Sequence, residues 1–225
     1  MITVYGTANT RAFRVLWMLE ELGVQYRHVP SDFASGETRT LAFLEINPNG
    51  HVPALVDGDL RLFESLAINL YLAERYGAVG FWPASLPDRA RAVQWSFWVM
   101  TECEARTFAV LFARGGPAFE KWRAWSATEE YRATHPDDVS VSPEQTALAA
   151  KNAEAALRLS FGVLDRELGD RAYLLGDSFG VADLNVASVL VTARLAQLDL
   201  SPHPRLDAWL ARCTSRPALA AAARK

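Results

Sequence analysis

Residues 47–65, NPNGHVPALVDGDLRLFES, constrain the fold more than any other stretch of the chain. They begin with a turn cluster at 47–50, in which proline fixes φ while asparagine and glycine tolerate left-handed conformations. Val52-Pro53 follows, and Asp57-Gly58 between two short apolar runs predicts a tight β-hairpin. Ser65 then precedes an apolar run at helical spacing, so we expect it at a helix N-terminus, where free amides favour a carboxylate. Together these elements form a compact unit suited to holding a peptide-like molecule with a free carboxylate.

The overall composition is that of an ordinary globular protein. Half of the 225 residues are hydrophobic, which allows a sizeable core, and the formal net charge is −3. Because the charge is small and no basic stripe is present, nucleic acid is not an expected partner. Cys103 and Cys213 fit no metal-binding or redox spacing and are expected to be buried thiols in a reducing compartment. With no signal sequence and no apolar run of membrane-spanning length, we expect a cytoplasmic protein without a metal or a membrane segment.

The N-terminal third alternates short strands with helices. The expected elements are a strand over 2–5, a helix over 10–22 ended by Gly23, a strand over 25–29, a short helix near 40–45, the hairpin, and a helix over 65–76. The resulting order, βαβαββα, excludes a purely parallel doubly wound sheet. Two arginines early in the first helix, Arg11 and Arg14, are interpreted as surface or interface charges.

These residues resemble the soluble glutathione S-transferase family. Residues 14–26, RVLWMLEELGVQY, resemble the family's first helix and second strand, and Val52-Pro53 resembles its X–cis-Pro pair. The resemblance implies a thioredoxin-like N-terminal domain, in which the Val52 backbone pairs with the cysteinyl unit of glutathione as a short added strand. Pro53 alone is equally compatible with an ordinary trans proline at the start of a strand.

The resemblance also implies residues for the two ends of glutathione. Glu64-Ser65 is similar to the family's acid–serine pair, in which the hydroxyl and the helix-start amide take the γ-glutamyl carboxylate and the acid faces the ammonium. His51 stands where relatives often carry a lysine or arginine that reaches the glycyl carboxylate. Without the resemblance, Ser65 is a plain helix cap and His51 an exposed turn residue.

The loop at residues 7–10 is the candidate catalytic loop. Only the thiolate of glutathione is a good nucleophile, so the protein must lower the thiol pKa with donors at a helix N-terminus. Family members place Tyr, Ser or Cys after the first strand, and this loop has none of them. Thr7 and Asn9 resemble the Thr-x-Asn of a bacterial nu-like subgroup, whereas capping alone explains Thr10. Thr7, Asn9, Thr10 and a backbone amide all remain open as the sulfur donor.

The rest of the chain predicts a second domain. Residues 78–87 are rich in Gly and Pro and indicate a linker between a domain over 1–77 and an all-α domain over 88–225. The aromatic residues of a helix over 88–113 are typical of a core, and by resemblance the face near the site also lines an electrophile pocket. The connection over 115–142 is unusually long. We expect it to hold a short helix and to shape the second-substrate site.

The C-terminal part contains two helix-start signals. Ser142 followed by proline predicts the start of a long helix that ends near Leu168. Residues 173–183 resemble a family motif whose capping box starts a buried helix. Gly180 occupies the cap position here, so half of the box is lost, and Asp183 is expected to meet the Gly180 backbone amide and the helix dipole, in a structural role.

The resemblance implies a thioredoxin-like α/β domain followed by an all-helical domain, assembled as a symmetric homodimer. The implied function is conjugation of glutathione, as co-substrate, to a small hydrophobic electrophile, an activity that serves detoxification. Two other functions remain open. A glutathione-dependent disulfide or peroxide reductase would use the same site, and a non-enzymatic member would use the fold as a protein-binding scaffold.

Overall fold

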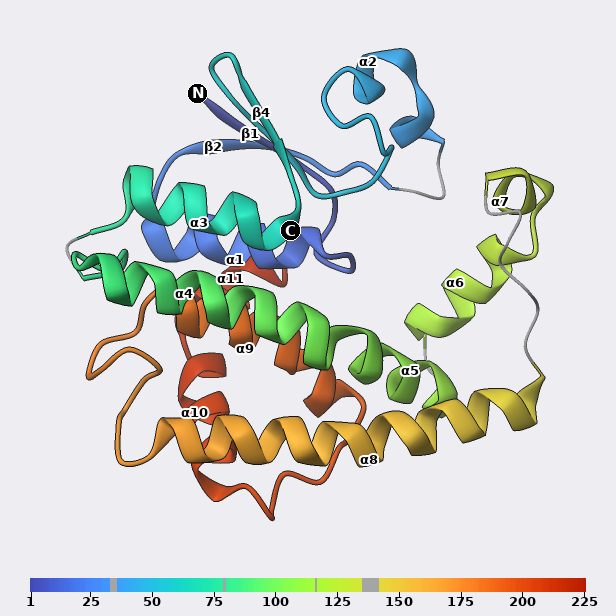
Figure 1. Ribbon diagram of the computed structural model, residues 1–225. Helices are drawn as coiled ribbons and strands as arrows, with labels where there is room; N and C mark the ends of the chain where they lie inside the picture. Colours follow the sequence, from blue (N-terminus) through green and yellow to red (C-terminus); the bar gives the residue numbers. More distant parts are fainter. Residues whose placement is uncertain (33–35, 79, 116, 135–141) are drawn as a thin grey trace.

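The N-terminal part of the protein is a mixed four-stranded sheet with helices (Figure 1). The computed structural model describes residues 1–32, 36–78, 80–115, 117–134 and 142–225. The elements in chain order are β1 (Ile2–Tyr5), α1 (Ala12–Leu22), β2 (Tyr26–Val29), a 3₁₀ turn (Glu37–Arg39), α2 (Leu41–Leu44), β3 (Ala54–Asp57), β4 (Leu60–Phe63) and α3 (Ser65–Tyr76). The strand order is β2-β1-β3-β4, with β1 parallel to β2 and the other two pairs antiparallel. The thioredoxin-like order predicted from the sequence is confirmed.

The hairpin and the X–Pro bond also form where they were predicted. The Val52–Pro53 peptide bond is cis. Asp57 pairs with Leu60, so the two turn residues are Gly58 and Asp59, one position later than the predicted Asp57-Gly58. Gly58 has a φ of 60°, as the first central residue of a type II′ turn requires. The observed turn lies one residue after the predicted turn because glycine, rather than aspartate, takes the positive φ of its first position.

The sheet and the helical part share one hydrophobic core. Helix α1 is apolar on nearly every side, and Trp17 is fully buried within it. Helices α1 and α3 pack against each other, and both contact the central helix α9 (Val181–Leu195). Figure 1 shows α1 and α3 lying between the sheet and the helices of the second half. The N-terminus of α1 is thereby held at the boundary between the two halves of the chain.

The second half is helical, as predicted, but its first long helix is not regular. Its elements are α4 (Leu86–Val99), a π-helical segment (Met100–Glu104), α5 (Ala105–Arg114), α6 (Pro117–Ser126), α7 (Glu129–Thr134), α8 (Pro143–Leu168), α9, α10 (Pro204–Thr214) and α11 (Pro217–Ala222). The single helix predicted over 88–113 is therefore interrupted by a π segment, which sequence periodicity does not reveal. The long connection holds two short helices instead of one, and its residues 135–141 lie outside the described part of the chain.

The two helix starts singled out in the sequence are both present. The Ser142 side chain accepts a bond from the Gln145 amide, and the Gln145 side chain accepts one from the Ser142 amide, which completes a capping box. The Gly180 amide donates to Asp183, 3.1 Å away, as expected for half of a box. Helix α11 returns to the first half and packs on α1. Over the described residues, no helix is both long enough and apolar enough to span a membrane.

Candidate active site

The loop after β1 lies directly against the Val52 segment. Gly6 has a φ of 120°, and a Cβ added there would lie 2.6 Å from the Ala12 Cβ and 2.9 Å from the Val52 Cβ. The carbonyl of Gly6 lies 2.7 Å from His28 Nε2 on β2, which fixes the start of the loop. The absence of a side chain at Gly6 therefore lets the N-terminus of α1 approach the residue before the cis-proline.

The three candidate sulfur donors differ in how their polar groups are occupied. Thr10 donates its hydroxyl proton to the Thr7 carbonyl at 2.8 Å and accepts the Ala12 amide at 3.1 Å. The helix-capping contact predicted for Thr10 is thus present, although Arg11 is the residue that precedes the helix. Thr7 donates its hydroxyl to the Asn9 side-chain oxygen, and Asn9 is exposed. Of the three side chains, Asn9 is the exposed one, and the Thr7 hydroxyl bonds to it, whereas the Thr10 hydroxyl is bonded twice within the loop.

The turn before Val52 is held by a buried asparagine. Asn47 donates its side-chain amide to the His51 carbonyl at 2.6 Å and accepts the Asn49 amide at 3.1 Å. Arg39 lies beside this turn, 3.4 Å from the Asn49 carbonyl, and a Cβ on Gly50 would be 2.8 Å from its Nη1. The sequence analysis missed Arg39, because the 3₁₀ turn that carries it shows no periodic pattern. Arg39 gives the part of the site next to the 47–50 turn a second basic group besides His51.

Glu64 and Ser65 sit at the start of α3 in different environments. Glu64 is exposed and has a φ of 70°, a region that residues with side chains rarely adopt and that is often found at functional sites. Ser65 is the first helical residue and is buried. Its amide belongs to the first turn of α3, where backbone donors have no partner within the helix.

Arg14 and Glu104 form a buried ion pair beneath Ser65. Arg14 Nη2 lies 2.6 Å from Glu104 Oε1, and Arg11 Nε lies 2.7 Å from the same oxygen. Arg14 Nη1 donates to the Ser65 hydroxyl oxygen at 3.3 Å. The prediction that Arg14 is a surface or interface charge is therefore wrong, since Arg14 is only 3% exposed. Its neighbours in an almost wholly apolar helix are the signal that could have indicated burial.

The electrostatics of this pair follow from burial and proximity. Burial lowers the pKa of Arg14, and the Glu104 carboxylate opposes that shift. Burial also acts to raise the pKa of Glu104, but the guanidinium groups of Arg14 and Arg11 outweigh it and hold that pKa below its ordinary value. Glu104 is thus an anion between two cations, and the Glu64 carboxylate also acts electrostatically on Arg14.

Aromatic side chains border the opposite side of the loop. The guanidinium of Arg11 lies 5.2 Å from the centre of the Phe108 ring, which itself lies 5.7 Å from the Phe112 ring. Arg11 is half exposed, whereas Arg14 is not. These contacts connect the N-terminus of α1 to α5, the helix from which the sequence predicted an apolar second-substrate surface.

The two cysteines take no part in the site. Both are buried free thiols, as predicted. Burial raises the pKa of Cys103 to about 12 and raises that of Cys213 as well, so neither forms a thiolate at neutral pH. Cysteine nucleophile chemistry is therefore not available to these residues.

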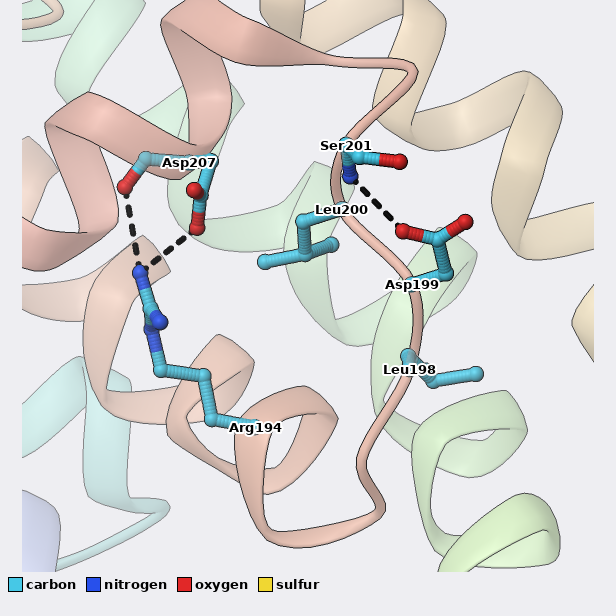
Figure 2. Close-up of a pocket in the computed structure, with 6 residues that line it drawn as sticks. All are labelled: Arg194, Leu198, Asp199, Leu200, Ser201 and Asp207. Atoms are coloured by element: carbon cyan, nitrogen blue, oxygen red, sulfur yellow. Dashed lines mark hydrogen bonds and ion pairs between the residues drawn. The ribbon is translucent and has the colours of Figure 1, made fainter.

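A separate surface hollow lies between α9 and α10. It is lined by Arg194, Leu198, Asp199, Leu200, Ser201 and Asp207 (Figure 2). Arg194 donates to the Asp207 carboxylate at 2.8 Å, and the Ser201 amide donates to Asp199 at 2.9 Å. Its polar groups thus pair with one another, and none of the candidate site residues lines it.

Comparison with known proteins gives the same family over nearly the whole chain. Residues 1–74 match the family model "Glutathione S-transferase, N-terminal domain", and residues 112–217 match "Glutathione S-transferase, C-terminal domain". Glutathione S-transferase GstB of Escherichia coli K12 is 32% identical, over 97% of this chain and 96% of the relative. The disulfide-bond oxidoreductase YfcG of the same organism is 27% identical, over 97% and 92%. A solved structure of glutathione S-transferase-I bound with lactoylglutathione has a TM-score of 0.76 at 27% identity, over 99% and 98%.

Proposed function

The chain belongs to the glutathione S-transferase family, and from this membership we propose that it conjugates reduced glutathione to a small hydrophobic electrophile. The observation that carries the proposal is the meeting of three segments. Gly6 brings the start of α1 against Val52, and Arg14 joins α1 to Ser65 at the start of α3. The relative GstB is named for this activity, and one solved relative is bound with lactoylglutathione.

Each part of glutathione has a proposed partner in this arrangement. The backbone of Val52 takes the cysteinyl unit next to Pro53, while the Ser65 hydroxyl and amide take the γ-glutamyl carboxylate. The carboxylate of Glu64 faces the γ-glutamyl ammonium. His51 and Arg39 together take the glycyl carboxylate, the guanidinium of Arg39 supplying a fixed positive charge. The aromatic surface around Phe108 supplies the electrophile side, and the role of residues 115–142 in electrophile choice stays a prediction.

Thr7 and Asn9 are the proposed donors to the glutathione sulfur. The Asn9 side chain is exposed, and among the described residues the Thr7 hydroxyl bonds to that exposed side chain, whereas the hydroxyl of Thr10 is bonded on both sides within the loop. We therefore expect Thr7→Ala and Asn9→Ala each to raise the pKa of the bound thiol by about one unit, the value of a charge-assisted hydrogen bond. Thr10→Ala is expected to lower stability by about 1 kcal/mol through loss of the cap. Ultraviolet difference absorbance of bound glutathione across a pH series measures the thiolate directly.

The same titration tests the proposed function itself. A bound thiolate well below the pKa of free glutathione supports conjugation. Binding without ionisation, together with tight binding of oxidised glutathione, would favour the disulfide or peroxide reductase, a candidate favoured by the Thr-x-Asn pattern and the relationship to YfcG. No binding of either form would leave the protein-binding scaffold as the function.

A cytoplasmic location is proposed with the enzyme, since both described cysteines are free thiols.

We propose a homodimer formed through exposed apolar residues of β4 and α4. Phe63 lies exposed on the edge strand, and Phe97 is 67% exposed on α4, one turn after the exposed Val93. Val93 and Phe97 are four residues apart and so lie on one face of α4, and an exposed apolar face is typical of interaction surfaces. We expect Phe97→Glu to convert the dimer to a monomer in sedimentation velocity, because a charge would be buried in the interface. Leu159→Glu on α8, at a position 76% exposed, is the matched control and should leave the dimer intact. A dimeric Phe97→Glu variant would contradict this interface.

A further inference from the structure

We propose that Arg14 is a positioning residue for glutathione, which acts through Ser65 and is held in place by Glu104 of the helical domain. The inference rests on the proposed function, because it concerns how Ser65 receives the γ-glutamyl carboxylate. It starts from three contacts of one buried guanidinium. Arg14 reaches Ser65 at 3.3 Å, Glu104 at 2.6 Å and the Met100 sulfur at 3.6 Å.

The first step concerns the direction of the Ser65 hydroxyl. A guanidinium is a donor only, so in its bond to Arg14 the Ser65 oxygen must act as acceptor. The hydroxyl proton then points away from Arg14, and no partner for it is found among the described residues. A hydroxyl fixed as an outward donor is the form that a carboxylate ligand requires. Arg14 therefore orients Ser65 before the ligand arrives.

The second step concerns charge. Two guanidinium groups, of Arg11 and Arg14, face the single carboxylate of Glu104. Of these two cations, Arg14 is the buried one, and it contacts the Ser65 oxygen directly. In such an environment a fixed charge acts more strongly on a ligand than it does in water. The γ-glutamyl carboxylate is thus attracted by Arg14 without touching it.

The third step concerns Glu104, which comes from the second half of the chain. The π-helical segment Met100–Glu104 presents both of its end residues to Arg14. Breaks of this kind in an α-helix are frequent at functional sites. The helical domain therefore contributes to glutathione affinity through Glu104, although the glutathione-binding residues proposed above all lie in the thioredoxin-like part. A purely structural ion pair would hold the two halves together and leave the affinity of Ser65 for its ligand unchanged.

The test is a double-mutant cycle in glutathione affinity, measured by isothermal titration calorimetry. The variants are Ser65→Ala, the paired Arg14→Met/Glu104→Leu, and the combination of all three. Removing both buried charges together avoids an unpaired buried ion, so the paired variant should remain folded, which its melting temperature will show. We expect the dissociation constant to rise about tenfold for Ser65→Ala alone, and about tenfold for the paired variant. In the paired background, Ser65→Ala should add only about threefold, because the hydroxyl is already free to rotate.

Two further measurements separate positioning from stability. The paired variant should raise KM for glutathione while kcat at saturating glutathione changes little, since the proposed sulfur donors are untouched. Arg14→Lys keeps a cation opposite Glu104 and should keep most of the stability, but a single ammonium does not reproduce the fork that reaches both Glu104 and Ser65. It should therefore retain the fold and lose affinity.

The outcomes distinguish this inference from the proposed function. If Ser65→Ala weakens binding by the same factor with and without Arg14, the positioning role is wrong while the glutathione site stands. If Arg14→Lys binds glutathione as tightly as the original protein, the inference also fails. If the unsubstituted protein does not bind glutathione at all, the proposed function itself fails.

Discussion

Replacing Asp183 with alanine is expected to lower the free energy of unfolding by about 4 kcal/mol, among the larger effects of a single substitution. The Asp183 carboxylate is fully buried and accepts three hydrogen bonds. Its donors are the Leu174 amide at 2.8 Å, the Trp209 indole at 2.8 Å and the Gly180 amide at 3.1 Å. Alanine would leave all three N–H groups buried without an acceptor. Urea unfolding followed by circular dichroism measures the loss.

The exposed Asp207 provides a matched control for this substitution. It pairs with Arg194 on the surface of α10, and an exposed ion pair contributes little. Asp207→Ala should therefore change the free energy of unfolding by about 0.5 kcal/mol or less. Equal losses for Asp183→Ala and Asp207→Ala would show that the buried network does not organise the C-terminal helices.

The pH dependence of the Asp183 effect has a defined sign. Burial raises the pKa of Asp183 in the folded protein to about 6, from an ordinary value of 3.8, although its three donors oppose the shift. A raised pKa in the folded state means that the protonated form favours folding. This contribution is fully present below about pH 4 and is lost as the pH rises through about 6. The difference between the original protein and Asp183→Ala should therefore be larger at pH 4.5 than at pH 7.5.

Local chemistry made much of the fold predictable. The turn at 47–50 and the capped start of α8 each depend on a few neighbouring residues with strong conformational preferences, whereas the cis bond before Pro53 was implied by the family resemblance alone. The predicted turn, Asp57-Gly58, lies one residue before the observed turn, Gly58-Asp59, because glycine takes the positive φ of the first turn position. Turn and helix-cap signals of this kind depend on residues within four or five positions of one another in the chain.

The part of the site that was missed depends on residues far apart in sequence. Arg14 and Glu104 meet across the two halves, and an ion pair of this separation leaves no local pattern. The π segment that presents Glu104 interrupts an aromatic helix whose spacing looked regular. A second buried contact of this kind joins Asn69 of α3 to Asn185 of α9 at 2.9 Å. Residues that connect the two domains are thus the ones that a sequence alone does not identify.

Replacing Gly6 with alanine is expected to damage both the fold and the site. A Cβ there would lie far inside the contact distance of the side chains of Ala12 and Val52, and φ is 120°, where alanine is strained. We expect the free energy of unfolding to fall by about 3 kcal/mol from strain and overpacking together. Val52 and the start of α1 must also move apart, so glutathione should bind at least tenfold more weakly, about 1.4 kcal/mol.

Substitution of Gly58 is the control that separates the effect of packing from the effect of backbone conformation in Gly6→Ala. It also has a positive φ, of 60°, but a Cβ there would meet nothing within 4 Å. Gly58→Ala should therefore cost about 1 kcal/mol of stability, the strain of a left-handed residue, and leave glutathione affinity unchanged. Urea unfolding and calorimetry on both variants make the comparison. If Gly6→Ala bound glutathione as tightly as Gly58→Ala does, the close approach of the α1 loop to Val52 would not be what assembles the site.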